Sequence, residues 1–139
     1  MLGGVTIEFP LGLEGHSDAD VLCHSIADAL LGAAGESDIG HLFPNTDEAL
    51  RGLNSLVIVR SVGEKLTAMD IVVVNVDATL VAEAPKMAPY LQGMKANLAE
   101  ALAVSPSRVG TKATTNEGLG FLGRGEGIAA LAVASVERK

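Results

Sequence analysis

The sequence contains no tryptophan, one tyrosine, three phenylalanines and one cysteine in 139 residues. The single cysteine, Cys23, excludes an internal disulfide and is typical of proteins in a reducing compartment. Ten Lys and Arg against 17 Asp and Glu give a formal net charge of −7. This acidic balance argues against nucleic acid as a partner, because nonspecific nucleic-acid binding relies on a basic surface.

Long hydrophobic runs are also missing from the sequence. No apolar stretch reaches the roughly 18 residues of a transmembrane helix, so we expect no membrane partner. The N-terminal MLGGVTIEFP lacks the charged and apolar regions of a secretory signal. We therefore expect a cytoplasmic protein, or a plastid protein if the source is plant-type.

The hydrophobic residues that are present, 48% of the chain, are enough for one domain with a core of small branched side chains. Strand patterns cover residues 5–9, 71–81, 109–115 and 128–136. Helical patterns run from Ser17 or Asp18 to about Leu31, over 53–66 and over 91–102. This alternation predicts one α/β domain over residues 1–139, an α+β two-layer sandwich whose mixed four-stranded sheet has helices on one face.

The first helix carries an unusual polar face, in the stretch GHSDADVLCHSIADALLG. Asp20, His24 and Asp28 are four residues apart and would line one side of the helix. A histidine between carboxylates is well placed as a metal ligand whose ring is oriented by its neighbours. A capped helix with a solvated acidic face explains the same pattern equally well. Cys23 is rotated away from this face and is expected in the core.

A glycine-rich segment near the C-terminus, NEGLGFLGRGEG, matches the G-x-G-x-x-G fingerprint of dinucleotide-binding proteins. The fingerprint requires a following helix, whereas IAALAVASV is rich in strand-forming residues, so a dinucleotide site is rejected. The segment KATTNEG offers hydroxyls, backbone N–H groups and the Glu117 carboxylate. Arg124 and Lys86 add cationic groups, and the combination favours metal-assisted diphosphate binding. Glycines in tight turns, with Arg124 paired to an acidic residue, are the alternative.

Four stretches now carry a resemblance: GHSDADVLCHSIADALLGAA, SDIGHLFPNTD, AEAPKM and KATTNEGLGFLGRGEGIA. In this order and spacing they closely resemble the 2-C-methyl-D-erythritol 2,4-cyclodiphosphate synthase family, over nearly the whole chain. The resemblance implies a homotrimer with active sites at subunit interfaces and a central channel that can hold isoprenoid diphosphates. It implies conversion of 4-diphosphocytidyl-2-C-methyl-D-erythritol 2-phosphate into the cyclic diphosphate with release of CMP. Zinc, together with magnesium or manganese, would assist.

The resemblance also implies roles for individual residues. His24 matches a zinc ligand, Glu117 the ligand of the second metal, and Asp28 a residue that orients the site. His16 and Thr115 match the pair that stabilises the transition state. The residues that match substrate contacts are His16, Ser17, Asp38, Ile39, Gly40, Phe43, Pro44, Asn45, Thr46, Asp47, Ala82, Glu83, Ala84, Pro85, Lys86, Met87, Ala88, Thr114, Thr115, Asn116, Glu117, Phe121 and Arg124.

One family motif has no counterpart here. The family carries a D-x-H motif near its N-terminus that supplies two of three zinc ligands, and D-x-H occurs nowhere in this sequence. We therefore expect the domain to lack the family's first strand, to have an incomplete zinc site and to be an impaired cyclase. A non-catalytic trimeric module that binds isoprenoid diphosphates and a metal-dependent phosphohydrolase are the alternatives. The family also usually has a glycine turn where this chain reads AMDIVVVNVD.

Overall fold

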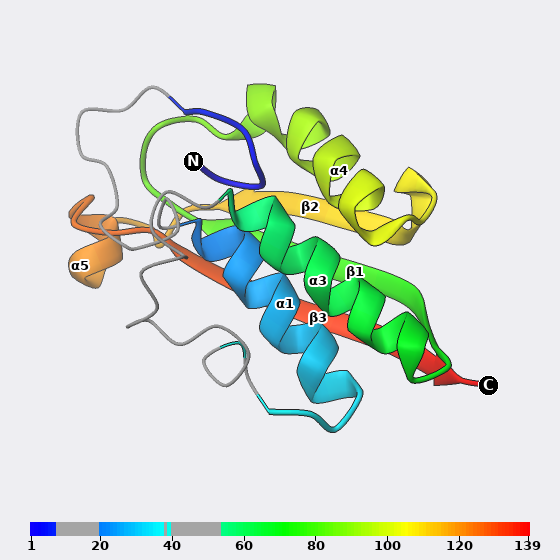
Figure 1. Ribbon diagram of the computed structural model, residues 1–139. Helices are drawn as coiled ribbons and strands as arrows, with labels where there is room; N and C mark the ends of the chain where they lie inside the picture. The colour runs from blue at the N-terminus through cyan, green and yellow to red at the C-terminus, as the bar shows by residue number, and fades with distance from the viewer. Residues whose placement is uncertain (8–19, 38, 40–53) are drawn as a thin grey trace.

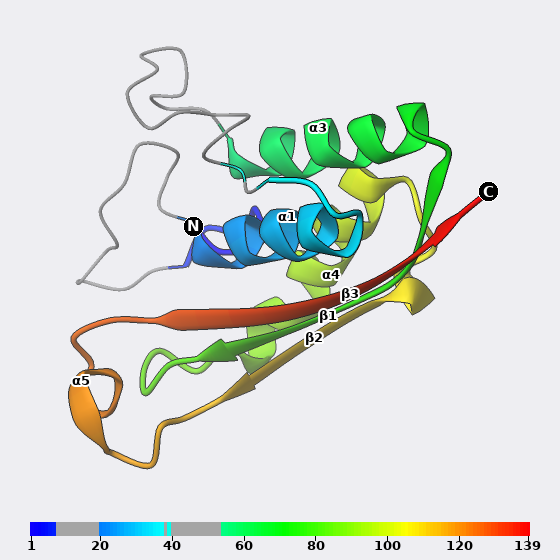
Figure 2. The ribbon, with the colours of Figure 1, turned by 90° about the horizontal axis from the view of Figure 1, so that it is seen from below.

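Three strands form a mixed sheet in the computed structural model of the chain (Figure 1). The structure describes residues 1–7, 20–37, 39 and 54–139. The strands β1 (Ile71–Val81), β2 (Val109–Thr114) and β3 (Ala129–Arg138) lie in the order β2-β1-β3. β1 is parallel to β2 and antiparallel to β3. The main helices pack on one face of the sheet, as Figure 2 shows, which confirms the predicted mixed sheet with one covered face.

The helices that build the second layer are α1 (Val21–Ala33), α3 (Ser55–Ala68) and α4 (Ala88–Leu102). A 3-10 turn, η2 (Pro106–Arg108), precedes β2, and a single turn, α5 (Gly120–Gly123), lies between β2 and β3. Helix α4 begins three residues before the predicted range because Pro89, which lacks an N–H, sits in the first turn, where no N–H is needed. Helix α1 begins at Val21, so the predicted cap at Ser17 or Asp18 is wrong, and Asp20 is the cap.

Strand β1 carries an irregularity that sets which side chains enter the core. Ile71 and Val73 are buried, and the buried positions then continue at Val76, Ala78 and Leu80. The register with β3 shifts between Val73 and Asn75. A bulge of this kind adds one residue, which moves the inward-facing positions from odd to even numbers. The turn before β1 holds Asp70 at φ 58°, a left-handed conformation common for glycine and tolerated by aspartate.

The predicted strand over residues 5–9 is wrong in its described part, residues 5–7. Leu2 and Val5 exchange two backbone hydrogen bonds of 2.9 Å around a turn at Gly3 and Gly4, whose φ angles are 55° and 73°. A Cβ at Gly3 would lie 2.7 Å from the Cβ of Met94, so the turn packs directly on α4. The described part of the chain therefore has a three-stranded sheet in place of the expected four strands.

Candidate active site

Two of the predicted substrate segments leave the sheet side by side. Strands β1 and β2 are parallel, and Val81 is the register partner of Thr114 at their carboxyl ends. The next residue after β1, Ala82, donates its N–H to the carbonyl oxygen of Thr114 at 3.0 Å. The segments 82–88 and 114–117 therefore begin at neighbouring points of one sheet edge, where parallel strands commonly carry ligand sites.

A carboxylate connects these two segments. Glu83 Oε1 accepts hydrogen bonds from the backbone N–H of Asn116 at 3.0 Å and of Gly118 at 2.9 Å. Between them, Glu117 has a φ of 54°, and its N–H donates to the Thr115 hydroxyl at 3.3 Å. Successive N–H groups that converge in this way form a cradle for an anion. The sequence predicted that N–H groups of this loop bind phosphate. In the structure, two of them donate hydrogen bonds to Glu83 instead.

Exposed groups that face solvent at this edge are still available to an anionic ligand. Thr114, Thr115, Glu117 and Lys86 are all exposed. Lys86 lies two residues before α4, whose N-cap makes no side-chain hydrogen bond. The N-terminus of a helix carries partial positive charge, so this lysine and the start of α4 create a local cationic region in an acidic protein.

The glycine-rich segment forms tight turns, as the alternative interpretation proposed. Gly118 and Gly120 have φ angles of 73° and 66°, and a Cβ at Gly123 would lie 2.1 Å from the carbonyl carbon of Gly118. The four-residue helix α5 leads into strand β3, which agrees with the rejection of a dinucleotide site. Nearby, Phe121 is 55% exposed.

Arg124 forms a bidentate ion pair with Glu126 of the same segment. Its Nε and one terminal nitrogen donate to the two carboxylate oxygens of Glu126 at 2.9 and 3.2 Å. Both side chains are more than half exposed, so the pair contributes little to stability. A phosphate would have to compete with Glu126 for this guanidinium.

The polar residues Asp20, His24 and Asp28 of helix α1 and its cap differ in burial and in hydrogen bonding. Asp20 is fully buried, and its two carboxylate oxygens accept from the N–H groups of Gly3, Gly4 and Cys23 at 2.9–3.0 Å. Asp20 therefore ties the N-terminal turn to the helix and does not belong to a metal-binding row. His24 is half-buried, and exposed Asp28 accepts the N–H of Ile39 at 2.8 Å.

Cys23 is a core residue, as predicted. Its thiol is fully buried and donates to Asp20 Oδ2 at 3.3 Å. Burial, with the nearby Asp20 charge and this hydrogen bond, raises the pKa of the thiol far above its usual range. The thiol is therefore protonated at neutral pH and is a poor nucleophile.

The described residues do not contain a group of three or more His, Cys, Asp or Glu side chains that could hold a metal ion. Several predicted residues lie outside the part of the chain that the structure describes: His16, Ser17, Asp38, Gly40, Phe43, Pro44, Asn45, Thr46 and Asp47. Sequence reasoning missed the cap at Asp20 and the bridging role of Glu83. An aspartate directly before the apolar helix pattern was a usable signal for the cap, whereas nothing local marks the Glu83 contacts.

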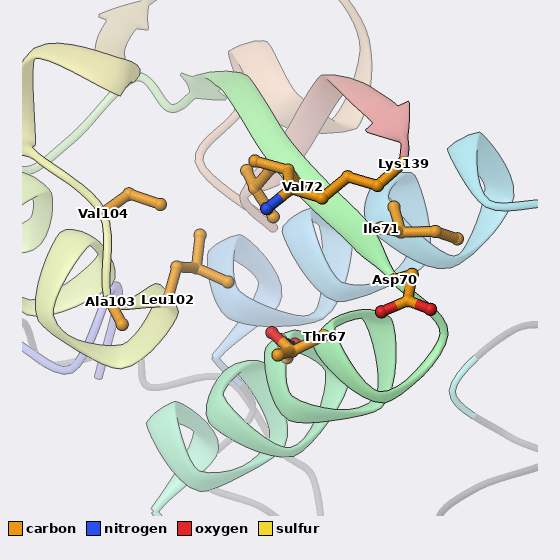
Figure 3. Close-up of a pocket in the computed structure, with 10 residues that line it drawn as sticks. Thr67, Asp70, Ile71, Val72, Leu102, Ala103, Val104 and Lys139 are labelled. Carbon is orange, nitrogen blue, oxygen red and sulfur yellow. Dashed lines mark hydrogen bonds between the residues drawn. The ribbon is translucent and has the colours of Figure 1, made fainter.

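A hollow of about 250 Å³ lies at the opposite end of the sheet (Figure 3). Its walls come from the end of α3, the start of β1, the end of α4 and Lys139. None of the predicted site residues that the structure describes lines it. In the described part of the chain, no helix is long and apolar enough to cross a membrane.

Comparison with known proteins identifies the family. The YgbB family matches residues 1–137. The 2-C-methyl-D-erythritol 2,4-cyclodiphosphate synthase of Pelotomaculum thermopropionicum is 52% identical over 99% of this chain and 85% of its own length. The bifunctional IspDF of Campylobacter jejuni is 40% identical with a TM-score of 0.95, over 100% of this chain and 38% of that protein. The Plasmodium falciparum IspF in complex with CDP is 31% identical with a TM-score of 0.86, over 99% of this chain and 83% of that one. The chain therefore belongs to the YgbB family, the family of the 2-C-methyl-D-erythritol 2,4-cyclodiphosphate synthases.

Proposed function

We propose that this chain converts 4-diphosphocytidyl-2-C-methyl-D-erythritol 2-phosphate into 2-C-methyl-D-erythritol 2,4-cyclodiphosphate and CMP, as a phosphorus–oxygen lyase. The observation that carries the proposal is the junction at the edge of the sheet. The segment 82–88 and the loop 114–117 start from paired strand ends and are joined through Glu83. A nucleotide on the first segment and a diphosphate on the second would then lie side by side. The single cysteine and the bacterial relatives support a cytoplasmic location.

The reaction brings two anionic groups together, because an oxygen of the 2-phosphate attacks the β-phosphorus while CMP leaves. The enzyme must therefore hold both groups in line and offset their charge. Lys86 supplies a fixed cation, and the hydroxyls of Thr114 and Thr115 supply hydrogen bonds to phosphate oxygens. No side-chain nucleophile is required, which agrees with the buried, protonated thiol of Cys23.

The two metals of the resemblance fit the described residues differently. Zinc requires three protein ligands in a site of this type. His24 matches one of them, but the described residues contain no group of three His, Cys, Asp or Glu side chains that could hold the ion. The described residues by themselves therefore do not form a zinc site. Magnesium is commonly bound by one or two carboxylates together with substrate phosphates. Exposed Glu117, on the diphosphate loop, fits that pattern, and the ion would supply charge neutralisation on the diphosphate.

A homotrimer is proposed because the face of the sheet opposite the helices carries large apolar side chains. Leu131 and Val133 of β3 are 63% and 72% exposed. Their register partners on β1 are Thr79 and Asp77, and Asp77 pairs with Lys112 of β2 on the same face. An exposed apolar strand of this kind is typical of an interface between subunits.

The trimer is tested by light scattering on the purified chain. A particle of about three times the 14.2 kDa chain mass is expected at micromolar concentration. Val133→Asp places a charge on the proposed interface and should give a monomer, whereas Val57→Asp, on the exposed side of α3, should leave the trimer intact. A monomeric parent chain would refute the proposal.

The activity is tested by incubating the chain with the proposed substrate and magnesium, followed by phosphorus NMR and chromatography of nucleotides. Cyclic diphosphate and CMP in equal amounts are expected. Release of inorganic phosphate instead would identify a phosphohydrolase. Unchanged substrate together with tight binding of a prenyl diphosphate would identify a non-catalytic module.

A further inference from the structure

Glu83 lies in the segment that resembles a substrate-binding stretch, yet its contacts are with the protein itself. One carboxylate oxygen, Oε1, accepts two backbone N–H groups from residues 33 and 35 positions later in the chain. Both distances, 3.0 and 2.9 Å, are those of well-formed hydrogen bonds.

The two donors flank a strained position. Asn116 and Gly118 stand on either side of Glu117, whose φ of 54° is a conformation that residues with a side chain rarely adopt. Such conformations persist where the surroundings impose them. The Glu83 carboxylate supplies part of that constraint. Two further hydrogen bonds add to it: the Glu117 N–H donates to the Thr115 hydroxyl, and the Asn116 side chain donates to the Leu119 carbonyl oxygen at 2.7 Å.

We propose that Glu83 is a positioning residue, which holds the loop 115–118 in the shape that presents Thr115 and Glu117 to the diphosphate. This inference rests on the proposed function, and it gives Glu83 a role different from substrate contact. The role requires an acceptor oxygen at this place and does not require the negative charge. Glutamine retains the oxygen and alanine removes it, so the two substitutions separate positioning from charge.

The test compares Glu83→Ala and Glu83→Gln with the parent chain in two measurements. Hydrogen exchange at the Asn116 and Gly118 amides, read by NMR, should accelerate at least about tenfold in Glu83→Ala and stay near the parent value in Glu83→Gln. Turnover should fall about 10- to 100-fold in Glu83→Ala, as for residues that orient a site, and stay within about threefold in Glu83→Gln. Glu100→Ala, an exposed glutamate of α4, serves as the control and should change neither quantity.

Each contrary result has a distinct meaning. Unchanged exchange in Glu83→Ala would overturn the proposal, because the loop would not depend on Glu83. An equal loss of turnover in both variants, with parent-like exchange in Glu83→Gln, would also overturn it and would assign Glu83 a direct charged contact. A parent chain that releases no CMP would refute the proposed function, while the exchange measurement would still decide whether Glu83 braces the loop.

Discussion

The two ends of the sheet differ in chemistry and in shape. At one end, β1 and β2 finish together at Val81 and Thr114, and exposed threonine, glutamate and lysine side chains follow them. At the other end lies the hollow of Figure 3, lined by aliphatic side chains together with Thr67, Asp70 and Lys139, whose side chain extends toward Val72. The residues of the proposed site that follow β1 and β2 thus lie at the end of the sheet opposite this hollow.

The connections between elements explain the difference. At the far end α3 passes into β1 through Met69 and Asp70 alone, and α4 reaches β2 through a few residues and η2. At the site end, the link 115–128 is longer than either of these and has room for side chains that bind a ligand, whereas the link 82–87 is only as long as the link 103–108 at the far end. Substitutions at the two ends should therefore have different consequences.

The largest effect is expected for Glu117→Gln at the site end. The substitution removes the carboxylate proposed to hold the second metal, and such an ion contributes several kcal/mol of charge stabilisation. Turnover should fall about a hundredfold, which corresponds to about 2.7 kcal/mol. Steady-state kinetics of CMP release measures it. Glu100→Gln on α4 is the matched control, and a loss below threefold for Glu117→Gln would remove this residue from the site.

An effect of comparable or smaller size is expected for Lys86→Ala. This change removes one charge-assisted contact, so the affinity for CMP should weaken by about 1.5–3 kcal/mol, measured by calorimetry. Lys65, which pairs with Glu36 at 3.3 Å away from the site end, gives the control variant Lys65→Ala. Equal CMP affinity in Lys86→Ala and the parent chain would show that Lys86 does not touch the nucleotide.

Gly123→Ala tests the shape of the loop at the site end. The added Cβ would lie 2.1 Å from the carbonyl carbon of Gly118, a contact that backbone can relieve only by moving. Overpacking of this kind costs about 1–3 kcal/mol of unfolding free energy, which chemical denaturation measures. Turnover should fall as well, because the displaced Gly118 is one of the donors to Glu83. A variant as stable and as active as the parent would mean that the turn tolerates a side chain.

The features of this molecule that depend on local sequence patterns were predicted correctly from the sequence in two places. The β-branched run 71–81 is strand β1 with the predicted bounds, and the glycines at 118, 120 and 123 form tight turns. The bulge near Asn75 was not predicted. Where both faces of a strand are apolar, the sequence does not show that the inward-facing positions change from odd to even numbers. The alternating residues after Val5 suggested a strand, but Gly3 and Gly4 close a turn that Asp20 holds.

The candidate site shows the same limit. The order of its motifs is visible in the sequence, whereas the contact between Glu83 and Gly118 joins residues 35 positions apart and has no local signature. The pairing of Arg124 with Glu126, two residues apart, is by contrast local, and the sequence offered it as an alternative. Contacts such as that between Glu83 and Gly118 depend on which strands become neighbours, which a single sequence does not specify.

The smallest effect is expected at the far end, for Gly63→Ala. Gly63 lies inside α3, and glycine within a helix costs about 0.5–1 kcal/mol relative to alanine. The new Cβ would lie 3.4 Å from Leu102 Cδ2, an ordinary contact that fills part of the hollow. Unfolding free energy should therefore rise by about 0.5–1 kcal/mol in denaturant titrations, with turnover unchanged. Because the same substitution at Gly123 is expected to lower both quantities, a loss of turnover in Gly63→Ala would mean that the two ends are coupled through α3 and that the far end is part of the machinery.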